Sequence, residues 1–109
     1  MEISKPYDKN FNKEEIIDIA FEKAFQQLIL KITTIEKKEI KKLSRLKNIY
    51  SLIESFSIVD EKFIDNKYIS IFEVEFNKKK LFNYLQNKNI FPSIPKDKDL
   101  LFEKIHNLN

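Results

Sequence analysis

The chain has 109 residues, no cysteine and no glycine, and its 20 basic and 17 acidic residues leave a net charge of +3. Without cysteine, disulfides and thiolate chemistry are excluded. Without glycine, phosphate-binding loops and dinucleotide fingerprints are excluded, because both need backbone that approaches phosphate closely. At 42% hydrophobic residues, the chain predicts one folded domain over 1–109.

In chain order, residues 2–5 predict a short strand. Asn12 then has the side chain of a helix N-cap, with Glu15 three positions on as in a capping box. Apolar residues follow at intervals of three and four, at positions 16, 17, 20, 21, 24, 25, 28, 29 and 32. This spacing predicts a helix over 13–32 with one buried face.

The next segments are shorter and more charged. Residues 35–43, "IEKKEIKKL", form either a helical turn or an exposed loop. Ser44 is predicted to cap a following helix, in which one side is lined by Leu46, Ile49, Tyr50 and Ile53.

Two alternating runs over 54–76 predict a β-hairpin. A two-residue turn at Asp65–Asn66 would place Ile58 opposite Glu73. A three-residue turn over 65–67 instead pairs Phe56 with Phe76 and Ile58 with Val74, which gathers the apolar residues on one face. We therefore expect the three-residue turn, with Asn66 in the left-handed conformation.

The same pairing predicts an apolar cluster on the outer face of the hairpin, made of Val59, Phe63, Ile69 and Ile71. Two explanations stay open for it. Either the N-terminal segment or "IFPSIP" (90–95) covers these residues, or they form a protein-binding surface.

After the hairpin, Asn77 is predicted to cap a helix over 78–88, with Leu81, Phe82 and Leu85 facing inward. Asn89 is expected to end it in the left-handed conformation. Prolines keep 90–95 extended. Residues 97–106 could form a last short helix, and helix and strand both stay open for 97–109. The order predicts an α+β fold, with helices on one face of an antiparallel, hairpin-based sheet, similar to a split β-α-β plan.

No group of residues predicts catalysis, a metal site or a cofactor. His106 is the only histidine and lies near the end of the chain, where a rigid triad is rare. Glu73 with Glu75, and Asp60 with Glu61, are read as solvated strand carboxylates, and they lack the spacing of a calcium loop. We expect a protein that is not an enzyme.

Basic residues form two groups, at Lys37, Lys38, Lys41, Lys42 and Arg45, and at Lys78, Lys79 and Lys80. Glutamates lie inside the first group, so a solvated basic surface is the expected reading. The alternative is a small cytoplasmic protein that binds nucleic acid or another anion through these lysines, although arginines for reading base edges are missing.

Three stretches resemble the N-terminal part of a bacterial family of secreted or periplasmic proteins, the domain of unknown function 2066 family. They are "AFEKAFQQLILKIT", "LIESFSIVDEKF" and "FEVEFNKKKLFNYLQNKNIFPSIP", and the resemblance covers roughly residues 12–96. It implies an envelope location, no known catalysis, and contacts with another protein or with the remainder of a longer chain.

Two features depart from that family. No signal peptide is visible, because "MEISKPYDKN" has no apolar core, and the chain as given predicts a cytoplasmic protein if it is complete. Family members also continue beyond the proline motif.

No window of the sequence has the length and apolarity of a membrane span, and an oligomer is possible.

Overall fold

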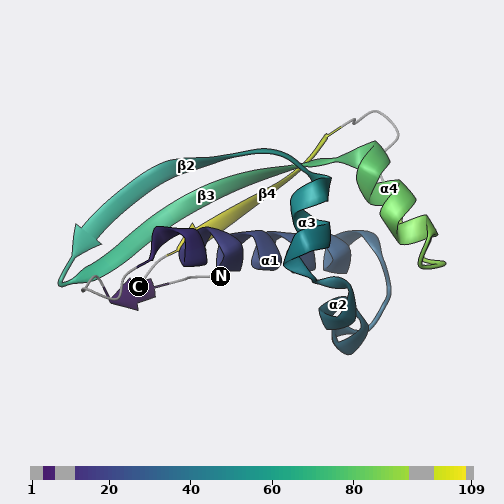
Figure 1. Cartoon of the computed structure of the whole chain (residues 1–109), viewed down its shortest axis with the longest axis horizontal. Coiled ribbons are helices and arrows are strands. Elements are labelled where there is room, and N and C mark those ends of the chain that lie inside the picture. The colour runs from purple at the N-terminus through teal and green to yellow at the C-terminus, as the bar shows by residue number, and fades with distance from the viewer. Residues whose placement is uncertain (1–3, 7–11, 94–99, 108–109) are drawn as a thin grey trace.

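The computed structural model describes residues 4–6, 12–93 and 100–107. In chain order the elements are β1 (Ser4–Pro6), α1 (Lys13–Ile32), α2 (Lys37–Leu43), α3 (Leu46–Leu52), β2 (Ile53–Ile64), β3 (Lys67–Asn77), α4 (Lys78–Gln86) and β4 (Leu100–Asn107). Figure 1 shows a curved antiparallel sheet with α1 lying along one side of it. The predicted α+β class is confirmed.

Strand β3 is the centre of the sheet. β2 pairs with it along one edge. On the opposite edge β4 pairs with 70–77 and β1 with 67–69, so these two strands lie end to end. Side chains alternate along β3: those facing the helices, from Tyr68 to Phe76, are buried, and those between them are half-buried.

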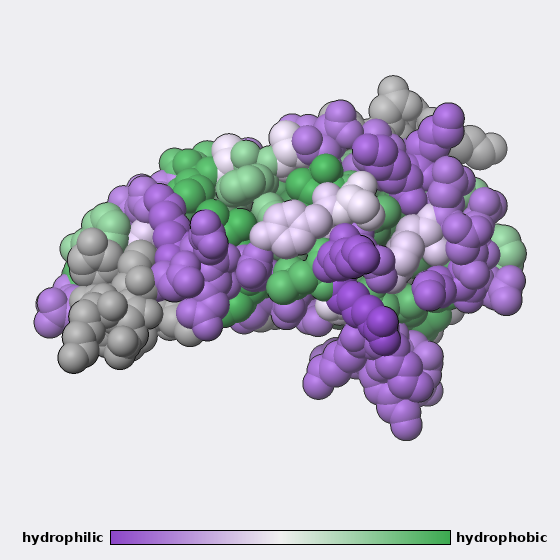
Figure 2. Space-filling model, in the orientation of Figure 1, coloured by the Kyte–Doolittle hydropathy of each residue, from purple (hydrophilic) through white to green (hydrophobic). Residues whose placement is uncertain are grey.

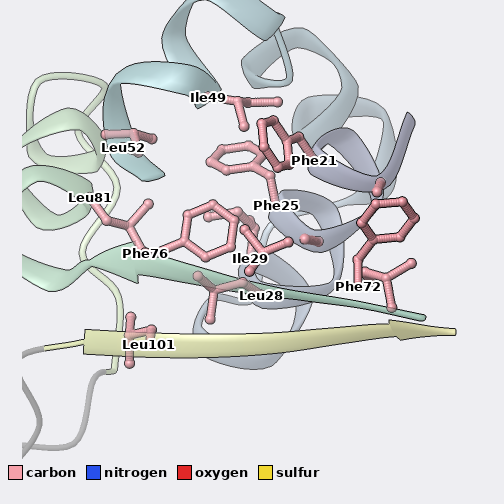
Figure 3. Packing of buried hydrophobic residues seen from close by; sticks show 14 of the residues in the cluster. Phe21, Phe25, Leu28, Ile29, Ile49, Leu52, Phe72, Phe76, Leu81 and Leu101 are labelled. Carbon is pink, nitrogen blue, oxygen red and sulfur yellow. The ribbon is translucent and has the colours of Figure 1, made fainter. Parts of the chain in front are cut away.

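The core lies between this face of the sheet and the helices. Helix α1 begins and ends where the spacing predicts, and Asn12 Oδ1 accepts a hydrogen bond from the Glu14 backbone N–H. Figure 3 shows Phe25 and Ile29 of α1 pointing toward Phe76 of β3. Ala20 and Ala24 are fully buried, and such small side chains let the helix approach the sheet closely.

The second and third helices correct the prediction at Ser44. Residues 37–43 form a helix that buries Ile40 and Leu43. Ser44 lies at the C-terminal end of α2, where its Oγ donates a 2.6 Å hydrogen bond to the Ile40 carbonyl. It does not cap α3, whose N-cap position is taken by Arg45 without a side-chain bond.

The hairpin turn is shorter than predicted. Ile64 pairs with Lys67, which leaves a two-residue turn in which Asp65 and Asn66 both have left-handed φ values of 51° and 60°. Such turns match the twist of the flanking strands. Asn66 was expected to be left-handed, and it is; the three-residue turn was wrong.

A β-bulge at Val59 reconciles the short turn with an apolar face. The register shifts between Ile58 and Asp60, so that Ile58 lies opposite Phe72 and Phe56 lies opposite Val74. Without the extra residue, both would face glutamates of β3. The predicted pairs were therefore wrong by two residues of β3, since Val74 was expected opposite Ile58 and Phe76 opposite Phe56. The apolar residues still gather on one face of the hairpin.

The C-terminal segment forms a strand where the structure describes it, which decides between the helix and the strand that the sequence left open. In β4, Leu101, Glu103 and Ile105 are buried, while Phe102 and Lys104 are exposed. This is the two-residue period of a strand. Asn77 caps α4 through its side chain, and Asn89 is left-handed with a φ of 59°, as both were predicted to be.

Candidate interaction surface

The outward edge of β2 is the most exposed part of the sheet. β3 is the only strand that pairs with β2 within the described part of the chain. Four large apolar side chains of β2 are 42–57% exposed, namely Phe56, Val59, Phe63 and Ile64. Figure 2 shows hydrophobic side chains gathered over the upper margin of the molecule, where Figure 1 places β2.

The predicted outer cluster does not form as one patch. Phe63 pairs with Tyr68, a fully buried residue of the helix side, and the two ring centroids are 5.2 Å apart. Ile69 and Ile71 lie on the opposite face and are half-buried. The bulge at Val59 is the reason, because one inserted residue transfers every later side chain of β2 to the other face.

Behind Phe63, a polar cluster ties β2 to the start of α1. Lys13 Nζ lies 2.8 Å from Glu61 Oε1, and this contact, followed by one with Tyr68, lowers the pKa of Glu61. Burial, followed by the hydrogen bond with Glu61, raises the pKa of Tyr68 to about 12. At neutral pH the cluster is therefore a lysine–carboxylate–phenol arrangement, which holds the hairpin against the helix.

An aromatic groove opens beside Phe56. We use this name for the hollow of about 280 Å³ lined by Glu14, Ile17, Asp18, Phe21, Tyr50 and Phe56. Phe21 is buried and meets both other rings edge to face, with centroids 5.1 Å from Tyr50 and 4.9 Å from Phe56. Tyr50 and Phe56 are 49% and 42% exposed. The groove thus has a buried aromatic floor and two half-open aromatic walls.

Carboxylates form the α1 side of this groove. The Tyr50 hydroxyl donates a hydrogen bond to Asp18 Oδ1, and this bond, ahead of burial, raises the pKa of Tyr50 to about 12; the charges of Asp18 and Glu14 add to the effect. The sequence alone does not predict this site. Its members come from α1, α3 and β2, and no local spacing connects Asp18 with Tyr50.

Two register shifts divide β2 into regular parts. One lies between Ile53 and Ser55 and the other between Ile58 and Asp60, so the stretch 55–58 is regularly paired with β3. This stretch contains Phe56 and therefore lies directly beside the aromatic groove.

The predicted basic groups lie on separate elements. Lys37, Lys38, Lys41 and Lys42 belong to α2, and Lys78–Lys80 begin α4. The two helices meet elsewhere, where the Tyr84 hydroxyl of α4 donates a 2.9 Å hydrogen bond to the Leu43 carbonyl of α2. All these lysines are exposed except the half-buried Lys78, and Arg45 is exposed between α2 and α3. Lys42 lies 3.5 Å from Glu39. Nucleic-acid binding stays a prediction.

The carboxylates singled out from the sequence are scattered. Asp60 and Glu61 fall on opposite faces of β2, and Glu73 and Glu75 lie on the outer face of β3 opposite Lys104 and Phe102 of β4. Among the described residues, no three histidine or acidic side chains are grouped as metal ligands would be. The side chain of His106 lies outside the described part.

Glu103 is the polar residue that sequence reasoning missed. Its side chain is 2% exposed on the helix side of β4, and its Oε1 accepts a 2.8 Å hydrogen bond from Lys31 Nζ at the end of α1. A segment that could form either a helix or a strand gave no reason to bury this carboxylate.

No described helix has the length and apolarity needed to cross a membrane. Comparisons with family models, with curated proteins and with solved structures find no match to this chain. The resemblance stated from the three sequence stretches therefore stays a prediction.

Proposed function

We propose that this chain is a non-enzymatic protein-interaction module that binds an extended segment of another protein at the open edge of β2. The observation that carries the proposal is an edge strand of 12 residues, unpaired on one side in the described chain, with four exposed apolar side chains. Following the resemblance, we place it in the cell envelope.

An open strand edge presents backbone N–H and C=O groups that another strand can pair with. Peptide-binding domains use this mode, in which the main chain supplies affinity and alternate side chains supply specificity. The 55–58 stretch is the part of β2 that suits such pairing, because it is regular and lies next to the aromatic groove.

The rest of β2 is protected against unspecific pairing. Bulges bound the 55–58 stretch on both sides, and charged residues follow at Asp60, Glu61 and Lys62. Bulges and charges are the devices by which edge strands avoid aggregation. Their placement leaves a short pairing segment, which favours a selective partner over general self-association.

The test begins with selection of 12-residue peptides from a displayed random library on the full chain. Hydrogen exchange, read amide by amide, should show that a selected peptide protects residues 55–58 of β2. Methylating alternate backbone nitrogens of the peptide should abolish binding for one alternate set and spare the other, because every second N–H faces the strand it joins.

Protection confined to α2 or α4, or equal losses from both methylated sets, would contradict strand addition. The control for nonspecific binding is a set of scrambled peptides without N-methylation.

A further inference from the structure

The position of the aromatic groove determines which side chains of a docked strand would reach it. Phe56 lies opposite the buried Val74 and therefore on the helix side of the sheet. Successive side chains of a strand point to opposite faces. A strand added beside 55–58 would direct every second side chain toward the helices, and the one next to Phe56 would enter the groove.

The groove is small. Its volume of about 280 Å³ lies near the lower limit of the roughly 300–1,000 Å³ typical of small-molecule pockets, and it has room for a long side chain of a docked strand. Its three rings offer apolar surface and electron-rich faces, which suit the aliphatic stem and the cationic head of a lysine or arginine.

The charges around the groove complement a cation. Glu14 and Asp18 line it, and within the described chain no ion pair involves either carboxylate. Lys13, at the start of α1, is already paired with Glu61 at 2.8 Å. Among the described residues, Asp18 accepts a hydrogen bond through Oδ1, from Tyr50, and its Oδ2 can face a cation.

We propose that the partner segment carries a lysine or arginine side chain that enters the aromatic groove, between the Tyr50 and Phe56 rings and the Asp18 and Glu14 carboxylates. This inference rests on the proposed function and names the chemistry of its partner: an extended, basic peptide.

The first experiment uses small probes that do not need strand pairing. Blocked lysine and arginine (N-acetyl, N′-methylamide) are titrated into the full chain, with blocked norleucine as the uncharged probe. The cationic probes should shift the NMR signals of the Phe21, Tyr50 and Phe56 rings, and norleucine should shift them far less. Equal shifts from all three probes overturn the cationic assignment.

The second experiment uses the selected peptides. They should carry a lysine or arginine at the position next to Phe56, and the E14Q/D18N variant should bind them roughly five- to tenfold more weakly. The matched control is E73Q/E75Q on the outer face, which should leave affinity unchanged. F56A is the second variant of the groove, and its folding is checked by circular dichroism.

The two proposals fail in different ways. In one outcome, the selected peptides protect β2 amides but lack a cation, and they bind E14Q/D18N as well as the parent chain. This outcome overturns the cationic assignment and leaves strand addition standing. In the opposite outcome, binding requires the peptide cation and the two carboxylates, while both sets of N-methylated peptides lose affinity equally. That result supports the groove and overturns strand addition.

Discussion

The two strands that flank β3 are held in opposite ways. β4 buries Leu101, Glu103 and Ile105 under α1, whereas β2 has exposed or half-buried side chains over its whole length. β2 leads directly into β3 through a two-residue turn, so a short loop keeps the two strands together. β4 comes from a distant part of the chain, and its position depends on the side chains that it buries.

This difference teaches where the protein can offer a surface. β4 also has an edge that no described strand pairs with, but its buried side chains complete the core, so a substitution there changes the fold. A strand held by its own hairpin can leave one edge and many side chains free. We therefore expect substitutions on β4 to affect folding and substitutions on β2 to affect binding.

Matched isoleucines test this contrast with the largest expected effect. Ile105 of β4 is fully buried and Ile64 of β2 is 49% exposed. Ile105→Ala should lower the free energy of unfolding by about 2–5 kcal/mol, because it removes apolar contacts and leaves a cavity. Ile64→Ala should cost about 1 kcal/mol or less. Urea denaturation measures both, and similar losses from the two variants would remove the contrast.

The ion pair on β4 is the next test. Lys31→Met leaves the Glu103 carboxylate buried without its ammonium partner, which should cost about 1–3 kcal/mol. The lower part of this range is expected because Lys31 itself is 64% exposed.

Two controls accompany that variant. Lys42→Met removes a surface pair with Glu39 and should change stability by less than about 1 kcal/mol. The double variant Lys31→Met, Glu103→Leu should recover much of the loss, because no charge stays buried. A double variant less stable than Lys31→Met would show that Glu103 has another role.

Alkaline pH tests two phenols that are hydrogen-bonded to carboxylates, Tyr68 to Glu61 and Tyr50 to Asp18. The folded state raises the pKa of Tyr68, and of Tyr50, from 10.0 to about 12. Between these values the unfolded chain loses protons that the folded chain keeps, so stability is complete below pH 10 and decreases as pH rises toward 12.

By about pH 11, Tyr68 should account for a loss of about 1 kcal/mol, and the half-exposed Tyr50 for less, because solvent screens it. Unfolding by urea across this pH range measures the loss. Tyr68→Phe should flatten the dependence, and an unchanged slope in that variant would assign the effect to other groups.

The hairpin turn provides the smallest effect. Asn66→Gly should raise the free energy of unfolding by about 0.5 kcal/mol, because glycine adopts the left-handed conformation without the cost of a Cβ. Asn83→Gly, in the exposed face of α4, should have the opposite sign and cost about 1 kcal/mol. Thermal unfolding measures both, and a loss at Asn66 would argue against the two-residue turn.

Local features of this protein were readable from the sequence. The apolar spacing and Asn12 determine the limits of α1, and Asn77 and Asn89 fulfil the roles that their side chains and backbone preferences predict. The alternation in β3 indicates which residues meet the helices. Each of these depends on residues within a few positions of one another, where short-range hydrogen bonds and side-chain period decide the conformation.

Other features depend on contacts between distant segments. The inserted residue at Val59 changes the face of Phe63, and no pattern within β2 distinguishes this pairing from a longer turn. "LLFEKIHN" fits a helix or a strand until β3 offers an edge and Lys31 accompanies the buried Glu103. The sequence by itself determined where α1 and α4 begin, their asparagine N-caps and the buried face of β3. Only the tertiary structure decided which strands close the sheet and which edge stays open, because backbone pairing and buried charge are satisfied between segments far apart in the chain.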